Sequence, residues 1–346
     1  MQKVQVVVQT AFLGDVILTI PFLLRLKSIS PSEKLIVVCK KGLGEFLKND
    51  GVVDGFIEIE KSDRQSYAKA RQQLKTFHIT YLYCIHRSIR SLLFSSQISA
   101  DQKIGFNSVL GFWVFDECVD YENRWPDAIR KFKLLRSRDQ EVKATLSEQN
   151  FDILNLADSK GKLPKTPKLF SFPRLQKIVK KQICLFPGSV WATKRWTKMG
   201  FTEVARKFNQ MGYQVLLLGG ADEKSLCDEI ALQVSGVKVF AGELTISESL
   251  KKVEESLLVV ANDSAATHMA AYKNTPAVTV FGATTLNLGF RPWSDESRVV
   301  QKELNCRPCG KHGPQKCPLG HHNCMKLIPS EVVIEKSLEL LKTNSQ

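Results

Sequence analysis

Short apolar runs alternate along the chain with longer segments in which apolar residues recur at helical spacing. In the first half these runs are rich in Val and Ile, and segments of ten or more residues separate them. We predict strands there at 4–8, 34–39, 55–59 and 79–85. Beta-branched runs that alternate with helical segments are typical of parallel strands joined by crossover helices. The first half therefore predicts a doubly wound α/β domain, followed by a polar helical region around 130–155.

The same alternation begins again in the second half of the chain. We predict helices at 201–211, 222–234 and 247–255, a further helix that begins at Asn262, and strands at 183–186, 214–218, 237–240, 257–261 and 277–281. The segment 160–182 between the halves holds three prolines and eight Lys or Arg but no Asp or Glu. We therefore predict an N-terminal Rossmann-like domain at 1–165, a basic linker at 166–182 and a C-terminal Rossmann-like domain at 183–346. Because open parallel sheets bind ligands beyond the carboxyl ends of their strands, we expect the two domains to face each other across a cleft.

Composition and charge narrow the class of protein. Hydrophobic residues make up 43% and charged residues 24% of the 346 residues, as in ordinary globular proteins, which excludes disordered and fibrous classes. The 49 Lys and Arg exceed the 35 Asp and Glu and give a formal net charge of +14, so we expect an anionic partner. Nucleic acid is disfavoured, because no basic stripe interleaved with aromatic residues and no known nucleic-acid-binding module is recognised.

The longest apolar stretch and the cysteines indicate where in the cell the protein is expected. Residues 4–24 are interrupted by polar residues and by Pro21, and they lack a small-residue cleavage site, so we predict neither a signal peptide nor a membrane span. The nine cysteines are an odd number, and several lie in or beside apolar runs, where cysteine usually behaves as a small buried hydrophobe. We therefore predict a cytoplasmic protein without a disulfide framework.

The first segment with candidate chemistry is 11–16, which follows the first predicted strand. Gly14 allows a sharp turn, and Asp15 comes next, at the expected ligand edge, where a carboxylate can remove a proton from a hydroxyl. The alternative is that Asp15 caps or charges the first turn of the following helix. The segment lacks the G-x-G-x-x-G pattern, so we do not predict a pyrophosphate cradle here.

The second segment, 186–196, follows the first strand of the second half. Ser189 and Thr193 offer hydroxyls, and Lys194 with Arg195 can neutralise a diphosphate as its charge develops. The alternative is a surface pair in which the two tryptophans of the segment contact the two cations.

Two further strand ends carry acidic residues. After the strand at 214–218 come two glycines and then Asp222 and Glu223, either of which can accept hydrogen bonds from a ribose diol, or Asp222 can simply cap a helix. The strand at 257–261 runs into Asn262, Asp263 and Ser264, where backbone amides at a helix N-terminus can bind an anion. His268 lies one helical turn further on, and its alternative is a role in packing.

A cysteine-rich segment lies near the C-terminal end. Cys306, Cys309, Cys317 and Cys324 fall within nineteen residues, and the first pair has the C-x2-C spacing of zinc sites, whereas the second pair does not. A structural zinc site on these four residues, free or redox-sensitive thiols, and a disulfide remain the three interpretations.

The strand-end motifs, in this order and spacing, resemble the bacterial lipopolysaccharide heptosyltransferases of glycosyltransferase family 9, and the heptosyltransferase II type in particular. The cysteine-rich tail, 306–309 with 317–325, is the most specific piece, and the likeness extends over nearly the whole chain. Ala265 departs from the glycine that the family usually has. The other stretches that carry the likeness are LGDVILTIP at 13–21, HRSIRS at 86–91, IGF at 104–106, PGS at 187–189, KRW at 194–196, NDS at 262–264, His268 and FGAT at 281–284.

The resemblance implies a GT-B fold, an ADP-heptose donor, an acceptor in the lipopolysaccharide inner core and inversion at the anomeric carbon, with no metal needed for catalysis. Asp15 would be the general base that activates the acceptor hydroxyl, and Lys194 would stabilise the departing ADP. Glu223 would hold the adenosine ribose. The donor's sugar and phosphates would be bound by Asp263, Ser264 and His268, beside the predicted donor-site residues Ser189, Thr193 and Arg195.

The basic excess fits an acceptor that carries phosphates and carboxylates at an anionic membrane face. Arg87 and Arg90, together with the lysines of the linker, would attract it, mainly through the association rate. We expect a monomer at the periphery of the inner membrane. Two alternatives remain: another family 9 transferase with a different nucleotide sugar or acceptor, and a non-catalytic nucleotide- or glycan-binding module. The presence of both Asp15 and Lys194 argues against the module, since a binding protein needs no base.

Overall fold

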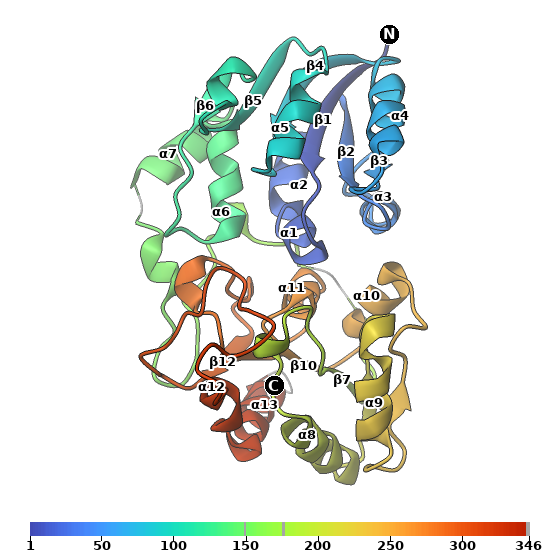
Figure 1. The fold of residues 1–346 in the computed structure, drawn as a ribbon, viewed down its shortest axis with the longest axis vertical. Coiled ribbons are helices and arrows are strands. Elements are labelled where there is room, and N and C mark those ends of the chain that lie inside the picture. Colours follow the sequence, from blue (N-terminus) through green and yellow to red (C-terminus); the bar gives the residue numbers. More distant parts are fainter. Residues whose placement is uncertain (149, 175–176, 344–346) are drawn as a thin grey trace. The chain divides into compact units, whose positions relative to one another are not determined.

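The computed structural model describes residues 1–148, 150–174 and 177–343. The chain divides into two compact units, each built around one parallel sheet (Figure 1). The first unit comprises Met1–Asn150 with Lys168–Phe170, and the second comprises Phe151–Pro167 with Ser171–Gln346.

The first unit contains a six-stranded sheet in the order β3-β2-β1-β4-β5-β6. All neighbouring strands pair in parallel, so that their carboxyl ends share one edge. The near-continuous apolar sequences of β1 and β2 suit strands that are covered on both faces. The strands are β1 (Lys3–Gln9), β2 (Lys34–Lys40), β3 (Gly55–Ile59), β4 (His78–Cys84), β5 (Gln102–Phe106) and β6 (Glu117–Val119).

Helices cover both faces of this sheet. Val4, Val6 and Val8 pack on the face that α4 and α5 cover, whereas on the other face Phe22 of α2 contacts Tyr83 edge-on (Figure 1). Alternate residues of β1 therefore belong to different cores, as the two-residue period of a strand requires. The helices are α1 (Leu13–Ile17), α2 (Ile20–Ile29), α3 (Glu45–Asn49), α4 (Arg64–Leu74), α5 (Ile89–Ser96), α6 (Asp127–Phe132) and α7 (Gln140–Glu148).

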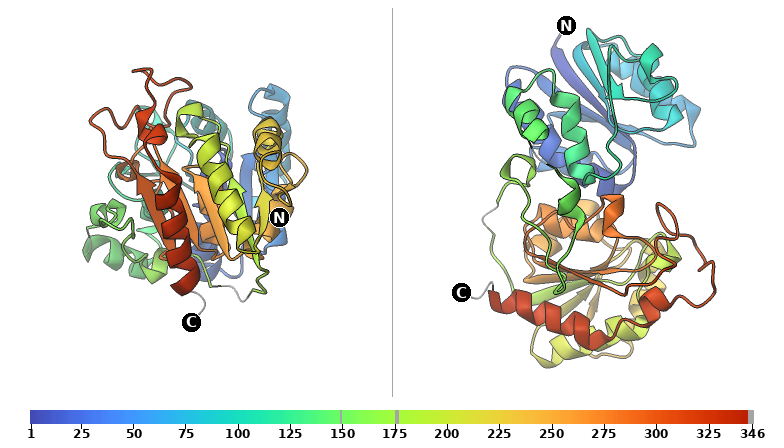
Figure 2. Two further views of the ribbon diagram at one scale, coloured as in Figure 1. Left: turned by 90° about the horizontal axis from the view of Figure 1, so that it is seen from below. Right: turned by 90° about the vertical axis from the view of Figure 1, so that its left-hand side faces the viewer.

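The second unit repeats the plan, with helices on both faces of a parallel sheet (Figure 2). Its six strands run in the order β12-β11-β10-β7-β8-β9. Apolar residues of α8, α9 and α13 form one core with the central strands. The strands are β7 (Gln182–Phe186), β8 (Gln214–Leu217), β9 (Lys238–Val239), β10 (Leu258–Asn262), β11 (Ala277–Phe281) and β12 (Ser297–Gln301). The helices are α8 (Lys198–Gln210), α9 (Lys224–Ala231), α10 (Ile246–Glu254), α11 (Ala265–Tyr272), α12 (Asn323–Lys326) and α13 (Ser330–Thr343).

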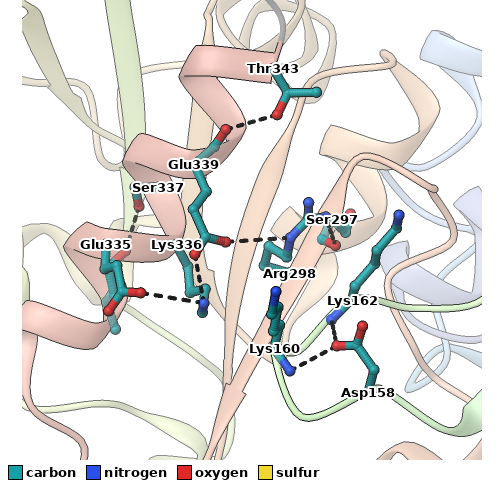
Figure 3. Close-up of polar contacts among 11 residues, drawn as sticks. Asp158, Lys160, Lys162, Ser297, Arg298, Glu335, Lys336, Ser337, Glu339 and Thr343 are labelled. Carbon is teal, nitrogen blue, oxygen red and sulfur yellow. Dashed lines mark hydrogen bonds and ion pairs between the residues drawn. The ribbon is translucent and has the colours of Figure 1, made fainter.

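The boundary between the units lies earlier than the predicted one, at 150 rather than 165. Residues 151–167 belong to the second unit because Arg291, which is fully buried, donates hydrogen bonds to the carbonyls of Leu154 and Pro164. Lys162 also forms a β-bridge with Arg298, whose guanidinium approaches Glu339 of α13 (Figure 3). Within the predicted linker 166–182, Phe170 and Phe172 are buried, and the amide of Thr166 donates to the Asp295 carboxylate at 2.7 Å.

Three strands were not predicted from the sequence: β5, β6 and β12. Searched over the described residues, the helices include none that is both long and apolar enough to cross a membrane.

Candidate functional site

Asp15 lies at the carboxyl edge of the first sheet, directly after β1. Helix α1 begins at Leu13 with Phe12 as its N-cap, so Asp15 is the third residue of the helix and not its cap. The loop before it is fixed by buried Gln9, which accepts a hydrogen bond from the amide of Ala11 at 3.4 Å and donates one to Thr19 at 3.1 Å. The structure thus rules out Asp15 as the N-cap, but it does place Asp15 in the first turn of α1, where a negative charge favours the helix dipole.

The surroundings of Asp15 make its carboxylate a stronger base than usual. The pKa of Asp15 is raised to about 6, mainly by burial and next by the negative charge of Asp127, while the positive charge of Lys131 acts in the opposite direction. Both neighbours are buried residues of α6 and are paired with each other. A carboxylate with this pKa is still ionised at neutral pH and accepts a proton more readily than an ordinary aspartate.

Basic side chains follow the neighbouring strands at the same edge. Lys61, after β3, is close enough to Asp15 to interact with its charge, and Arg90 donates a hydrogen bond to the Lys61 carbonyl at 3.3 Å. Arg87 is exposed and stacks over the ring of Tyr121 with its guanidinium carbon 4.0 Å from the ring centroid. The predicted acceptor residue Arg90 therefore lies beside Lys61, which sequence reasoning missed, whereas Arg87 lies against Tyr121.

His86 is a second residue that the sequence analysis did not single out, although it begins the quoted HRSIRS stretch. Its Nδ1 lies 2.8 Å from the Thr10 hydroxyl and 3.0 Å from that of Ser91. Burial, and next the charge of Lys61, lower the pKa of His86 to about 4, so the ring is neutral at pH 7. The position of both residues just after parallel strands is the signal that could have found them.

In the second unit, Asn262 at the end of β10 fixes the loop that follows β7. Its amide group donates to the carbonyls of Pro187 at 2.9 Å and Gly188 at 3.1 Å, while its oxygen accepts from the amide of Trp196 at 2.8 Å. The side chain is fully buried, so these bonds are shielded from water. Both ends of segment 187–196 are thereby attached to one strand.

Lys194 and Asp263 form the central ion pair of this edge. The ammonium lies 2.6 Å from the Asp263 carboxylate, and the Thr284 hydroxyl donates to the same carboxylate at 2.5 Å. Asp263 is buried and the Lys194 side chain retains 13% exposure. An ammonium has three N–H donors, so Lys194 held in this way can still donate to an anionic ligand.

Glu223, rather than Asp222, is the acid that points inward after β8. Asp222 is exposed, whereas the Glu223 carboxylate accepts from the amide of Gly220 at 2.9 Å. Burial raises the pKa of Glu223, and the charge of Arg195 lowers it. A Cβ on Gly188 would lie 2.0 Å from a Glu223 carboxylate oxygen, so any side chain at position 188 would displace the Glu223 carboxylate.

The other predicted donor residues have partners inside the unit. Ser189 is buried, and its carbonyl accepts from Nε of Arg195 at 2.8 Å. Ser264 is the N-cap of α11 and accepts from the amide of Ala266 at 3.3 Å. His268 is buried within α11.

The tryptophans of segment 186–196 do not form the surface pair considered as an alternative. Trp196 is buried, its indole N–H donates to the Ile328 carbonyl at 3.1 Å, and Trp191 stacks on His312 with ring centroids 5.9 Å apart.

The predicted zinc site is not assembled among the described residues. Searched over that part of the chain, no group of three or more His, Cys, Asp or Glu side chains is placed to hold a metal ion. Cys309 donates to the Cys306 carbonyl at 3.4 Å, and Cys317 accepts from the amide of His322 at 3.4 Å. Burial, and next the charges of Cys306 and Cys317, raise the pKa of Cys309, so these thiols lie near one another without forming a set of metal ligands in the described chain. All four are free cysteines, and Cys324 alone is buried.

Comparison with known proteins places this arrangement in a family. The chain matches the model of glycosyltransferase family 9 (heptosyltransferase) over residues 67–318. It is 35% identical over 182 residues to lipooligosaccharide heptosyltransferase 2 of Campylobacter jejuni subsp. jejuni serotype O:2, covering 51% of this chain and 56% of that protein. The chain thus spans about half the length of the first curated relatives it matches.

Two solved structures share the fold at low identity. The structure of E. coli ADP-heptose lps heptosyltransferase II superposes with a TM-score of 0.75 and 19% identity, covering 100% of both chains. The glycosyl transferase family 9 structure from Veillonella parvula DSM 2008 gives a TM-score of 0.77 and 18% identity, covering 99% of this chain and 98% of that one. The predicted fold class, two Rossmann-like domains of the GT-B type, is confirmed. Because the family model matches well over half of its length, the chain belongs to glycosyltransferase family 9, the heptosyltransferases.

Proposed function

We propose that the protein is an inverting glycosyltransferase that moves a heptose from ADP-heptose to the inner core of lipopolysaccharide. The observation that carries the proposal is Asp15, a carboxylate with a pKa of about 6 at the edge of the first sheet. Proton removal from a sugar hydroxyl needs a base that is ionised at neutral pH and yet binds a proton well. Family membership supplies the reaction class.

On the donor side, Lys194 stabilises the ADP leaving group. Its pairing with Asp263 holds the ammonium in place before the reaction, so that little reorganisation is needed as negative charge develops on the diphosphate. The Glu223 carboxylate accepts from the ribose hydroxyls, and the amides at the start of α11 bind phosphate oxygens. The predicted donor residues Ser189, Arg195, Ser264 and His268 complete this set, whereas the Thr193 hydroxyl donates to the Pro314 carbonyl.

On the acceptor side, Arg87, Arg90 and Lys61 attract the phosphates and carboxylates of the inner core. Their charges also raise the local concentration of an anionic acceptor, an effect that added salt reduces.

We also propose peripheral association with the anionic inner membrane. We define an exposed apolar patch as Ile89 and Leu93 of α5, which also carries Arg90, with Val109, Leu110, Phe112 and Trp113. Inner residues of α5 and Phe115 pack in one core cluster, which supports placing both segments on the same face of the sheet. Apolar side chains beside basic ones are the combination that binds an anionic lipid surface.

The proposed step uses side chains of this chain, and no cofactor is assigned to it. Zinc is assigned no role in the reaction. Elemental analysis of the purified protein would decide whether the four-cysteine segment takes up a metal.

The test is to incubate the purified protein with ADP-heptose and a truncated core acceptor and to measure the mass of the product by mass spectrometry. We expect an acceptor heavier by one heptose, with the opposite anomeric configuration to the donor. A panel of other nucleotide sugars separates this function from that of a different family 9 transferase. Binding of ADP with no transfer to any acceptor would instead favour the non-catalytic module.

A further inference from the structure

The cysteine-rich segment packs against the loop that carries Lys194. We call residues 302–324 the cysteine segment and residues 189–195 the Lys194 loop. Both belong to the second unit, where the cysteine segment follows β12. The function proposed above gives the cysteine segment no role, so the contacts between the two segments remain to be explained.

Hydrogen bonds join the two segments along their length. The amide and hydroxyl of Thr193 both donate to the Pro314 carbonyl, at 3.4 and 2.5 Å. The side chain of Gln315 accepts from the amide of Ala192 at 3.1 Å and donates to the Val190 carbonyl at 3.0 Å. The Thr193 hydroxyl, predicted to bind the donor, therefore holds the cysteine segment instead.

His322 contacts the backbone directly before Lys194. Its Nε2 lies 2.9 Å from the carbonyl oxygen of Thr193, the residue directly before Lys194. A carbonyl can only accept a hydrogen bond, so Nε2 carries the proton. The backbone of His322 is in the left-handed region, with φ 53°, and its amide donates to the thiol of Cys317. Non-glycine residues seldom adopt this conformation, so the surroundings must hold it in place.

The same segment also fixes the partners of Asp263. The amide of Cys309 donates to the Ala283 carbonyl at 2.8 Å, and the Arg307 guanidinium donates to the Thr284 carbonyl at 2.8 Å. Thr284 is the residue whose hydroxyl binds Asp263. The cysteine segment therefore contacts the backbone next to Lys194. It also contacts the backbone of Thr284, whose hydroxyl binds Asp263, the ion-pair partner of Lys194.

We propose that His322 is a positioning residue for Lys194, which it holds in place through the carbonyl of Thr193. The inference rests on the proposed function, in which Lys194 stabilises the leaving group. Loss of the imidazole N–H frees one side of the Lys194 loop and lets the ammonium move away from the position it needs in the transition state.

The experiment compares three variants of the full chain. His322→Ala removes the N–H, His322→Gln keeps an N–H donor at a similar reach, and His321→Ala is the matched control. The ring of His321 accepts from the amide of Asn323 at 3.0 Å, inside the cysteine segment itself. Alanine and glutamine at 322 face the same backbone conformation, so the difference between them reports on the hydrogen bond.

The first readout is hydrogen exchange of the peptide that covers 190–196, which needs no substrate. We expect exchange in His322→Ala to be about threefold faster or more, with near wild-type exchange in His322→Gln and His321→Ala. If His322→Ala does not fold, His322→Phe, which keeps a ring and lacks the N–H, replaces it in the comparison with His322→Gln. Wild-type exchange of this peptide in whichever of the two variants folds would overturn the inference.

The second readout is transfer from ADP-heptose. We expect kcat for His322→Ala to fall about tenfold, with ADP affinity changed less than about threefold, because an interaction used in the transition state is lost. Equal losses in all three variants, together with a lowered melting temperature, would show a merely structural segment and overturn the inference. If the wild-type protein transfers no heptose, the proposed function fails. Hydrogen exchange alone then still tests whether His322 holds the Lys194 loop in place.

Discussion

Asp15 is the residue whose ionisation most directly controls the proposed reaction. Asp15→Asn removes the proton acceptor and keeps the size of the side chain. We expect transfer to fall at least about a hundredfold, as for loss of a general base. ADP binding should stay within about twofold, because the predicted donor residues lie in the other unit. Product formation and calorimetric titration with ADP measure the two quantities.

The same substitution tests the helix role. In the folded protein the pKa of Asp15 is raised to about 6, so ionising the carboxylate costs stability as pH rises from about 4 to about 6. Asp15→Asn should therefore be at least as stable as the wild-type protein at pH 7. A lowered melting temperature at that pH, with weakened ADP binding, would assign Asp15 to the helix instead.

Asp127 offers a separate test through pH dependence. Its negative charge is the second cause of the raised pKa of Asp15, after burial. Asp127→Asn should lower the pKa of Asp15 towards, but not to, its ordinary value of 3.8, because burial remains. The acidic limb of kcat/KM against pH, expected near pH 6 in the wild-type protein, should move to lower pH.

The matched control for this shift is Glu122→Gln. Glu122 pairs with Lys133 at 2.9 Å and is not among the groups that shift the pKa of Asp15. Its acidic limb should coincide with that of the wild-type protein. An unshifted limb in Asp127→Asn would show that a group other than Asp15 titrates in the rate.

At the scale of elements, the Asn262 side chain joins β10 to the loop after β7. Asn262→Ala leaves three buried backbone groups without their side-chain partner, and we expect a loss of about 3 kcal/mol in the free energy of unfolding. Transfer should fall as well, because the freed loop carries Lys194. Chemical denaturation and steady-state kinetics measure the two effects.

Asn209→Ala is the control for an ordinary amide contact. Asn209 donates one hydrogen bond, to the Ser235 carbonyl at 2.8 Å near the surface, so its loss should cost about 1 kcal/mol or less and leave transfer unchanged. A similar loss of unfolding free energy for both substitutions would show that the hydrogen bonds of Asn262 contribute no more to stability than a surface hydrogen bond.

Most elements could be predicted because their apolar periods are strong. All the strands predicted from the sequence form, and each candidate acidic residue follows a strand as expected. β5 was missed because its sequence begins with Gln and Lys and contains Gly105, which leaves room for Phe115. β6 has only three residues and lies at an edge of its sheet, so it is too short to show a recognisable pattern of apolar residues.

The site was less predictable, since contacts distant in sequence create it. Asp127 and Lys131, which shift the pKa of Asp15, come from a helix more than a hundred residues away, and no local pattern links them. The bond from His322 to Thr193 likewise joins residues far apart in the chain. Sequence spacing could place Lys194 and Asp263 at strand ends, but their ion pair depends on how adjacent strands pack.

At the scale of the whole molecule, net charge and the apolar patch act together. In the proposed membrane association, a net charge of +14 would attract the protein to anionic lipid, and burial of apolar side chains would then hold it there. Trp113 and Phe112 are 78% and 59% exposed, so replacing both with Ser removes the largest apolar surface of the patch with little loss of packing.

We expect Phe112→Ser with Trp113→Ser to weaken binding to vesicles that contain phosphatidylglycerol by about tenfold or more, since burial of one aromatic side chain contributes roughly 1.5–3 kcal/mol. Wild-type binding should also weaken as salt is raised, because the charge attraction is screened. Leu232→Ser is the control, as Leu232 is 87% exposed in the other unit, outside the patch. Sedimentation with vesicles measures all three proteins. Equal binding by the wild-type protein and the double variant would show that the apolar patch does not bind the membrane. Equal binding of the wild-type protein to neutral vesicles would show that charge attraction does not contribute.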